Sequence, residues 1–301
     1  MKVLVAGGYG FLGQKIISDL SDAGYKITVA GRRSPESISA GGVDHIMADL
    51  MIPGPWQEEA GNYDVIINLV GVNIFQKWDD EKKKAIYDSR ILSTRNIVDA
   101  LRDKGGKRRI FINASAVGIY GDGGDRELDE QSPAGDDFLS RVCRDWEKEA
   151  LIGLESGLRV AILRFGTVLG GSGGAFPELK KKFGLFMGAK LGNGKQWFPW
   201  IHADDVSSII MKIIKNSKME GVYNCVSPGI VTNSYFTDIM SEEIHRPVII
   251  PFVPRFILKF MFGEFGGYLV KGQRAVPSRL LKEGYKFRYS DLRRAVKDLL
   301  E

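Results

Sequence analysis

The feature that most constrains this chain is a glycine-rich turn, Gly7-Gly8-Tyr9-Gly10-Phe11-Leu12-Gly13, close to its start. The apolar run 2–6 before the turn is typical of a buried strand. Apolar residues at helical spacing follow over 14–20. Glycines placed between a strand and a helix predict a dinucleotide-binding turn. The alternative is a strand–helix turn without a ligand, which the position and flanks of the glycines disfavour.

The residues of this turn have separate expected roles. Gly7 permits the tight bend, and Gly10 lets the backbone approach a pyrophosphate. Gly13 allows the helix to pack closely on the strand. Phe11 and Leu12 would offer backbone N–H groups at the positive end of the helix dipole, where phosphate binds.

Strand-like and helix-like segments alternate through the first half of the chain. This order predicts an α/β fold with a Rossmann-like, doubly wound parallel sheet, whose ligands bind at the carboxyl ends of the strands. Those ends carry Val70 and Gly71 after the fourth strand and Ser115 after the fifth. The expected later strands are 26–30, 43–48, 64–70, 109–115 and 158–164, and the expected later helices are 79–104, 136–156 and 204–216.

The regular alternation loosens after Leu169. We expect a dinucleotide-binding domain over 1–169, to which 200–220 returns. Residues 170–199 and 221–301 would form a smaller C-terminal α/β domain on the substrate side.

Charge and cysteine content exclude several classes of function. With 42 basic and 37 acidic residues the net charge is +5, and the basic residues are too scattered to predict nucleic-acid binding. Cys143 and Cys225 fit neither a metal site nor a disulfide framework, so we expect no metal and a cytoplasmic location. No apolar run is long enough to span a bilayer. The segment 248–262 comes nearest and predicts a strand and then a core or lid helix, with a membrane-surface or dimer face as the alternative.

The end of the second strand favours NADP(H) over NAD(H). An NAD site usually places an acid there, whereas this chain has Arg32 and Arg33, which can bind a 2′-phosphate. Asp49 and Leu50, after the third strand, are candidates to accept a hydrogen bond from the adenine amino group. The alternative for the arginines is a solvated turn.

Three stretches resemble motifs of the extended short-chain dehydrogenase/reductases: 6–13, 113–121 and 200–206. More closely, the chain resembles the atypical, SulA-like "epimerase family protein" branch of the NAD-dependent epimerase/dehydratase superfamily. The resemblance covers nearly the whole chain and implies an NADP-binding, epimerase-like fold. Further stretches that carry it are 67–71, 77–78, 89–94, 137–147, 191–197 and 272–280.

The chain departs from the superfamily in its catalytic positions. The resemblance implies a Tyr four residues before a Lys, but none of the ten tyrosines has a Lys at that spacing. The position of the usual active Ser or Thr is Ala116, one residue after Ser115. The Arg that binds substrate phosphates is replaced by the stretch 197–199, so a nucleotide-diphosphate sugar is not the expected substrate.

Other residues are candidates for the chemistry. Ser115 and Tyr120 lie just beyond the fifth strand, where either hydroxyl could stabilise negative charge on a substrate carbonyl. Tyr120 could equally be a packed ring with a satisfied hydroxyl. Trp197 and Trp200 would suit an apolar or aromatic substrate, or simply pack the domain junction.

The resemblance places Arg90 and Arg274 at the cleft, with Arg274 able to bind a substrate carboxylate. We therefore expect an NADP(H)-binding, epimerase-like oxidoreductase that acts on a small molecule without the usual Tyr/Lys pair. The alternative is a non-catalytic NADP(H)-binding protein that senses redox state or regulates a partner. By analogy, a homodimer would form through the helices at 79–104 and 136–156.

Overall fold

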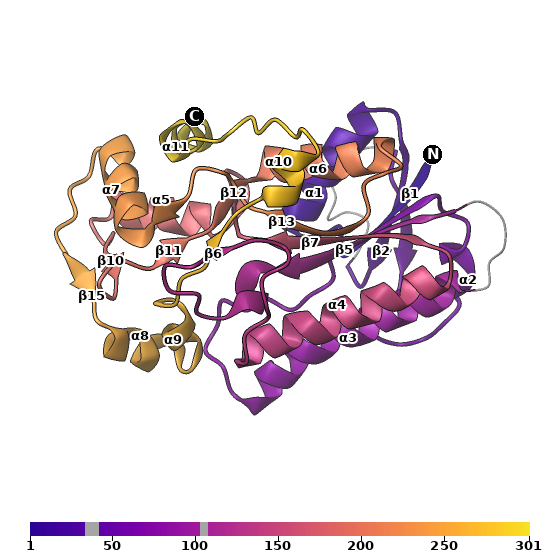
Figure 1. Ribbon diagram of the computed structural model, residues 1–301, viewed down its shortest axis with the longest axis horizontal. Helices are drawn as coiled ribbons and strands as arrows, with labels where there is room; N and C mark the ends of the chain where they lie inside the picture. The colour runs from indigo at the N-terminus through magenta and orange to yellow at the C-terminus, as the bar shows by residue number, and fades with distance from the viewer. Residues whose placement is uncertain (34–41, 103–107) are drawn as a thin grey trace.

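A seven-stranded parallel sheet crosses the centre of the computed structural model, which describes residues 1–33, 42–102 and 108–301 (Figure 1). The strand order β13-β7-β5-β4-β1-β2-β3 runs in both directions from β1, as in a doubly wound fold. The predicted fold class is therefore confirmed. The strands of this sheet are β1 (Lys2–Ala6), β2 (Lys26–Gly31), β3 (Asp44–Met47), β4 (Val65–Asn68), β5 (Ile110–Ala116), β7 (Arg159–Phe165) and β13 (Gly221–Cys225).

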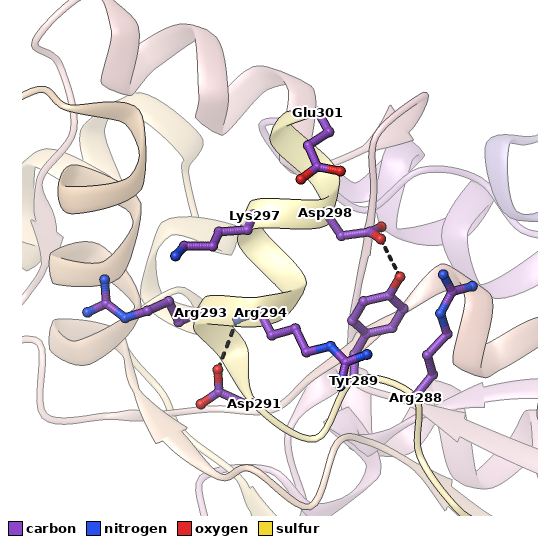
Figure 2. Close-up of a pocket in the computed structure, with 8 residues that line it drawn as sticks. All are labelled: Arg288, Tyr289, Asp291, Arg293, Arg294, Lys297, Asp298 and Glu301. Carbon is purple, nitrogen blue, oxygen red and sulfur yellow. Dashed lines mark hydrogen bonds between the residues drawn. The ribbon is translucent and has the colours of Figure 1, made fainter.

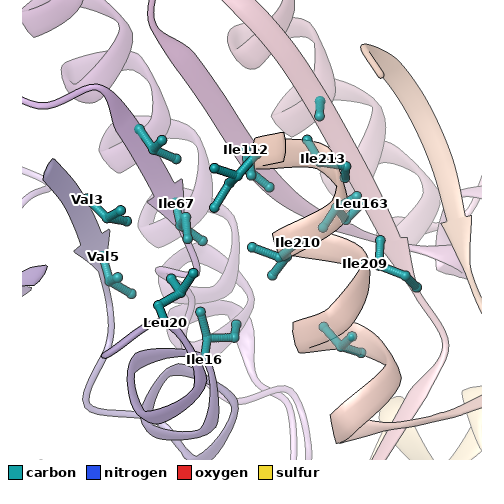
Figure 3. Close-up of a cluster of buried hydrophobic side chains, with 14 of the residues drawn as sticks. Val3, Val5, Ile16, Leu20, Ile67, Ile112, Leu163, Ile209, Ile210 and Ile213 are labelled. Atoms are coloured by element: carbon teal, nitrogen blue, oxygen red, sulfur yellow. The ribbon is translucent and has the colours of Figure 1, made fainter. Parts of the chain in front are cut away.

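Helices cover both faces of the sheet. On one face, α1 (Phe11–Asp22) and α6 (Ala203–Lys215) contribute buried isoleucines and a leucine that pack against strand valines and isoleucines (Figure 3). On the other lie α2 (Trp56–Ala60), α3 (Asp80–Leu101) and α4 (Phe138–Glu155), and α3 and α4 run side by side. The expected end of the α3 helix, near residue 104, falls outside the described residues. Burial on both faces explains why the strands are almost entirely apolar.

The edge strand β13 extends the sheet beyond the segment that we expected to return to it. Its partner is β7, with Tyr223 opposite Leu163 and Cys225 opposite Phe165. The sequence analysis had grouped this strand with the substrate-side residues. Because β13 is far from β7 along the chain, its pairing with β7 could not be predicted from the local sequence pattern.

The smaller region is built from short strands and helices around an aromatic core. Trp200, Phe176, Phe183 and Phe236 pack together there. Among the residues that the structure describes, no helix combines the length and the apolar character needed to cross a membrane. The remaining elements are η2 (Val117–Tyr120), β6 (Glu127–Leu128), β8 (Thr167–Gly170), β9 (Gly173–Gly174), α5 (Phe176–Gly184), β10 (Lys190–Leu191), β11 (Trp197–Phe198), β12 (Trp200–His202), β14 (Val231–Thr232), α7 (Asn233–Ile244), β15 (Phe252–Val253), α8 (Arg255–Phe262), α9 (Phe265–Tyr268), β16 (Arg274–Ala275), α10 (Ser278–Lys282) and α11 (Leu292–Leu300).

The glycine turn has the geometry that the sequence predicts. Gly7 has a φ of 75°, in the region that favours glycine. A Cβ atom on Gly13 would lie 2.6 Å from the Cα atom of Gly8, so only glycine lets α1 begin this close to the turn. The first turn of α1 is thereby held against the end of β1.

Substitution of Gly13 tests this close approach. We expect Gly13→Ala to lower the free energy of unfolding by about 1–3 kcal/mol, because the added methyl group would push the start of α1 away from the backbone of Gly8. Urea unfolding followed by circular dichroism measures the change. Gly184→Ala is the control, since nothing lies within 4 Å of that position. Equal stabilities of the two variants would contradict the packing role of Gly13.

Candidate functional site

The predicted cofactor residues come together at the carboxyl edge of β1, β2 and β4. The Gly7 N–H donates to the Ala30 carbonyl at 3.0 Å, which ties the turn to β2. A Cβ atom on Gly7 would lie 3.0 Å from the nitrogen of Val70, so the turn also touches the end of β4. Gly71 follows at the exposed surface. This edge is where a doubly wound sheet binds its ligand.

The start of α1 has unoccupied donors. Its N-cap residue is Gly10, and no side chain in the described parts of the chain caps the helix, whereas Asp79 caps α3 and Asp137 caps α4. A Cβ atom on Gly10 would meet only the Gly7 carbonyl oxygen, at 3.8 Å. Free N–H groups, the positive end of the helix dipole and open space fit a pyrophosphate.

The side chains of Phe11 and Leu12 turn into the protein rather than toward this space. Phe11 lies against Gly173 and Gly174, where added Cβ atoms would approach its ring to 3.0 and 2.9 Å. Leu12 packs against the core beneath the sheet. Their contribution to a phosphate site is thus confined to the backbone N–H groups.

Two arginines flank the turn on the β2 side. Arg33 donates from Nη1 to the Tyr9 carbonyl at 3.3 Å. Nη1 of Arg32 lies 3.8 Å from Oδ2 of Asp49, and the Arg32 side chain is 70 % exposed. A pair this open is held weakly, so Arg32 can turn to another anion at little cost.

The adenine-side candidates are already engaged within the protein. Asp49 Oδ1 accepts from the Met51 N–H at 3.0 Å. The Leu50 carbonyl accepts from Nδ2 of Asn96 at 3.0 Å, and the Leu50 side chain is buried. Of these groups, Oδ2 of Asp49 lies 3.8 Å from Nη1 of Arg32.

A buried amide network holds the end of β4, and the sequence analysis missed it. Asn68 donates from Nδ2 to Thr94 Oγ1 at 2.8 Å and to Asn113 Oδ1 at 2.7 Å. Its Oδ1 accepts from the Val70 N–H at 3.1 Å, and Trp146 Nε1 donates to Thr94 at 2.8 Å. The available signal was an asparagine within each of two apolar strands, since buried amides need partners.

Ser115 faces α4. Its hydroxyl donates to Glu147 Oε1 at 2.6 Å, deep in the protein. Glu147 also receives two bonds of 2.8 Å from Arg164, one to each carboxylate oxygen. Burial opposes the charge of Arg164, but the hydrogen bonds and charge of Glu147 outweigh it and raise the Arg164 pKa.

Tyr120 joins the same network from the other side. Its hydroxyl donates to Asn224 Oδ1 at 2.7 Å and accepts from Arg164 Nη1 at 2.8 Å. Burial is the main cause that raises the Tyr120 pKa. The two predicted catalytic hydroxyls are therefore linked through Glu147 and Arg164 and are both satisfied inside the protein.

The nearby thiol is not a reactive group. Cys143 lies on α4 beside Ser115, and burial raises its pKa to about 12. A thiol with such a pKa is not ionised near neutral pH and is a poor nucleophile.

Arg90, on α3, extends its guanidinium to the segment that follows β4, next to the cofactor edge. Its Nη1 donates to the carbonyls of Val72 and Ile86 at 3.1 and 3.0 Å, and its guanidinium stacks on Trp146. A Cβ atom on Gly71 would lie 3.0 Å from the guanidinium. Burial lowers the Arg90 pKa.

The two candidate tryptophans have different surroundings. Trp200 is 1 % exposed, packs in the aromatic core and donates from Nε1 to the Gly229 carbonyl. The packing alternative therefore describes Trp200. Trp197 is half-buried, donates to Asp125 at 2.9 Å and stacks under the Arg274 guanidinium at 5.0 Å. Arg274 also faces Glu127, with Nη2 3.8 Å from Oε2.

His202 is a helix cap. Its Nδ1 accepts from the Asp204 N–H at 3.1 Å, at the N-terminus of α6. Asp298 Oδ2 lies 3.3 Å from Nε2, and ligand atoms of these three residues lie within 4.8 Å of one another. Burial lowers the His202 pKa, so the ring is neutral, and the bond at Nδ1 puts its proton on Nε2.

A pocket of about 370 Å³ lies beside this cap, on α11 (Figure 2). Its cations are largely paired: Arg293 with Glu242 and Glu243, and Arg288 with Asp204 at 3.0 Å. Tyr289 donates to Asp298. These bonds fasten α11 and the loop before it to α6 and α7.

Removal of Glu147 tests the buried pair. We expect Glu147→Ala to lower the free energy of unfolding by about 3–5 kcal/mol, because it leaves Arg164 charged and buried without a partner. Urea unfolding measures the change. Glu149→Ala is the matched control on the same helix, since Glu149 pairs with the half-exposed Arg95. It should cost no more than about 1 kcal/mol. Similar losses in both variants would contradict the role of the pair.

Comparison with protein families finds two matching stretches of the chain. Residues 3–225 match the model of the "NAD dependent epimerase/dehydratase family", and residues 253–299 match a "Domain of unknown function (DUF1731)". The first match contains the entire parallel sheet apart from Lys2 of β1. The second contains the elements from β15 to α11 except for one terminal residue at each end.

Individual relatives cover the whole chain. The epimerase family protein YfhF of Bacillus subtilis is 34 % identical, over all of this chain and 98 % of its own. The SDR39U1 homologue of Arabidopsis thaliana, described as chloroplastic, is 33 % identical over all of this chain and 87 % of its own. A crystal structure of the human epimerase family protein SDR39U1 with NADPH superimposes with a TM-score of 0.85 at 28 % identity, over 99 % of both chains. The resemblance seen in the sequence is thereby confirmed, and the chain belongs to the NAD dependent epimerase/dehydratase family.

Proposed function

We propose that this protein binds NADP(H) at the carboxyl edge of β1, β2 and β4 and is an oxidoreductase for a small molecule. One observation carries the choice of NADP(H): the exposed Arg32 and Arg33 flank a helix start that no side chain caps. A 2′-phosphate on the ribose would lie within reach of two guanidinium groups there. The structure of human SDR39U1 with NADPH supports the same choice.

An arginine swap tests the nucleotide preference. We expect Arg32→Asp to weaken NADPH binding by about 10- to 100-fold, because a charge-assisted hydrogen bond is lost and a repulsive charge is added. NADH binding should change far less. Calorimetric titration with both nucleotides measures the two affinities. Arg144→Asp, an exposed arginine on α4, is the control. Equal losses for NADPH and NADH would contradict the assignment.

Bound NADPH would supply the hydride, and the residues of the chain would position the nucleotide and the substrate. The N–H groups of α1 would hold the pyrophosphate, and Val70 and Gly71 would line the path toward the nicotinamide. We assign the substrate side to Arg90, Trp197 and Arg274, and the half-buried Trp197 ring favours an apolar or aromatic substrate. Ser115 and Tyr120 are the candidate donors to a substrate carbonyl, which requires that a hydroxyl leave its present partner.

A double variant tests this catalytic assignment. We expect Ser115→Ala combined with Tyr120→Phe to abolish NADPH consumption on a panel of aldehydes and ketones, while NADPH still binds. Absorbance at the nicotinamide band measures turnover, and calorimetry measures binding. Tyr235→Phe, on the exposed face of α7, is the control. Unchanged turnover in the double variant would remove both residues from the mechanism.

A second candidate function is non-catalytic NADP(H) binding, in redox sensing or regulation of a partner. The observation in its favour is that both hydroxyls are engaged by Glu147, Arg164 and Asn224. NADPH binding without turnover of any carbonyl would favour it.

We also propose a cytoplasmic location, because both cysteines are buried and unpaired. We further propose that the protein forms a homodimer through α3 and α4. We propose no nucleic-acid partner for it.

A further inference from the structure

Helix α8 presents large apolar side chains to solvent. Phe256 is 72 % exposed, Phe260 is 85 % exposed and Met261 is 54 % exposed. Ile257 is exposed beside them, and Ile249, Ile250 and Phe252 continue the surface in the preceding segment. A concentration of exposed apolar side chains in one short segment marks an interaction surface.

The rest of α8 explains why this face points outward. Leu258 is the buried residue of the helix, and Phe262 packs edge to face on Phe265. Successive residues of a helix are about 100° apart, so the four exposed apolar residues span about 140° opposite this packed side. The helix is thus anchored along one side and leaves an apolar side open.

A rigid support holds the helix in this orientation. A Cβ atom on Gly266 of α9 would lie 2.0 Å from the Leu258 carbonyl oxygen, so the two helices are in backbone contact. Phe265 packs on Trp78, with ring centroids 5.2 Å apart, and Glu264 pairs with Lys83 at 2.8 Å. The helix pair is therefore fixed to the start of α3, at one corner of the molecule (Figure 1).

Two cations border the open side. Arg255 and Lys259 are exposed, one helical turn apart, between the apolar side and the packed side. Neither forms a hydrogen bond or ion pair with any other residue in the described parts of the chain. The nearby acid Glu264 is already paired with Lys83. An apolar helix side with unpaired basic residues at its border complements an anionic lipid surface.

We propose that α8 and the segment 249–252 bind the surface of an anionic membrane. Phe256, Phe260 and Met261 would enter the boundary between headgroups and acyl chains, while Arg255 and Lys259 would contact lipid phosphates or carboxylates. This binding goes beyond the proposed oxidoreductase function and does not depend on it. A second copy of the chain is the less favoured occupant, because a symmetric contact through α8 would bring four unpaired cations together.

Vesicle co-sedimentation tests the proposal on the full chain. We expect the protein to pellet with phosphatidylcholine vesicles that contain phosphatidylserine, and at least about tenfold less with pure phosphatidylcholine. The double variant F256S/F260S should lose at least about tenfold in bound fraction. R255Q/K259Q should lose the preference for phosphatidylserine. L281S, which removes an exposed leucine from α10, should bind like the unchanged protein.

Thermal unfolding and circular dichroism of each variant confirm that the fold is intact, which is expected because the altered side chains are exposed. No binding to phosphatidylserine vesicles would overturn the proposal, as would full binding by F256S/F260S. Gel filtration tests whether a second copy of the chain, rather than lipid, covers this surface. If the unchanged protein is a dimer and F256S/F260S is a monomer, a second copy covers this surface instead of lipid.

Discussion

The ion pair between Glu147 and Arg164 connects more parts of this structure than any single apolar contact described above. It joins α4 to β7, and through Ser115 it reaches β5. Through Tyr120 and Asn224 it reaches β13, the strand at one edge of the sheet. Because both charges are buried, each depends on the other for its opposite charge. The position of the sheet edge relative to α4 therefore depends on a contact between two charged side chains.

The two polar regions at the carboxyl edge of the sheet differ in one physical respect. Among the described residues, no side chain caps the backbone N–H groups around the glycine turn, and Arg32 is held by a weak, open ion pair. Around Ser115 and Tyr120 the donors and acceptors are already matched within the protein. Free donors favour ligand binding, whereas satisfied ones favour stability. This contrast makes the nucleotide site the better supported half of the proposed function.

Much of the fold could be predicted from the sequence because its signals are local. The apolar strands and the glycine turn are each recognised from a few consecutive residues, and the alternation of strands with helices follows from their order along the chain. The sequence analysis therefore placed the glycine turn, Arg32, Arg33 and Val70 at one edge, where the structure has them. It missed the amide network of Asn68 and Asn113, whose partners are distant along the chain. It also assigned Trp200 to the substrate side, because the sequence around a tryptophan does not show whether its ring is buried.

By itself, the sequence determined the α/β class, the nucleotide-binding turn and the absence of the usual Tyr/Lys pair, since each depends on residue types at short, fixed spacings. Only the tertiary structure decided which polar groups remain free. The Ser115 hydroxyl, for example, is engaged by Glu147, which lies 32 positions further along the chain, so the residues around Ser115 do not predict this bond. The exposure of α8 was also decided in three dimensions, because an apolar stretch forms a core when another element covers it and an interaction surface when none does.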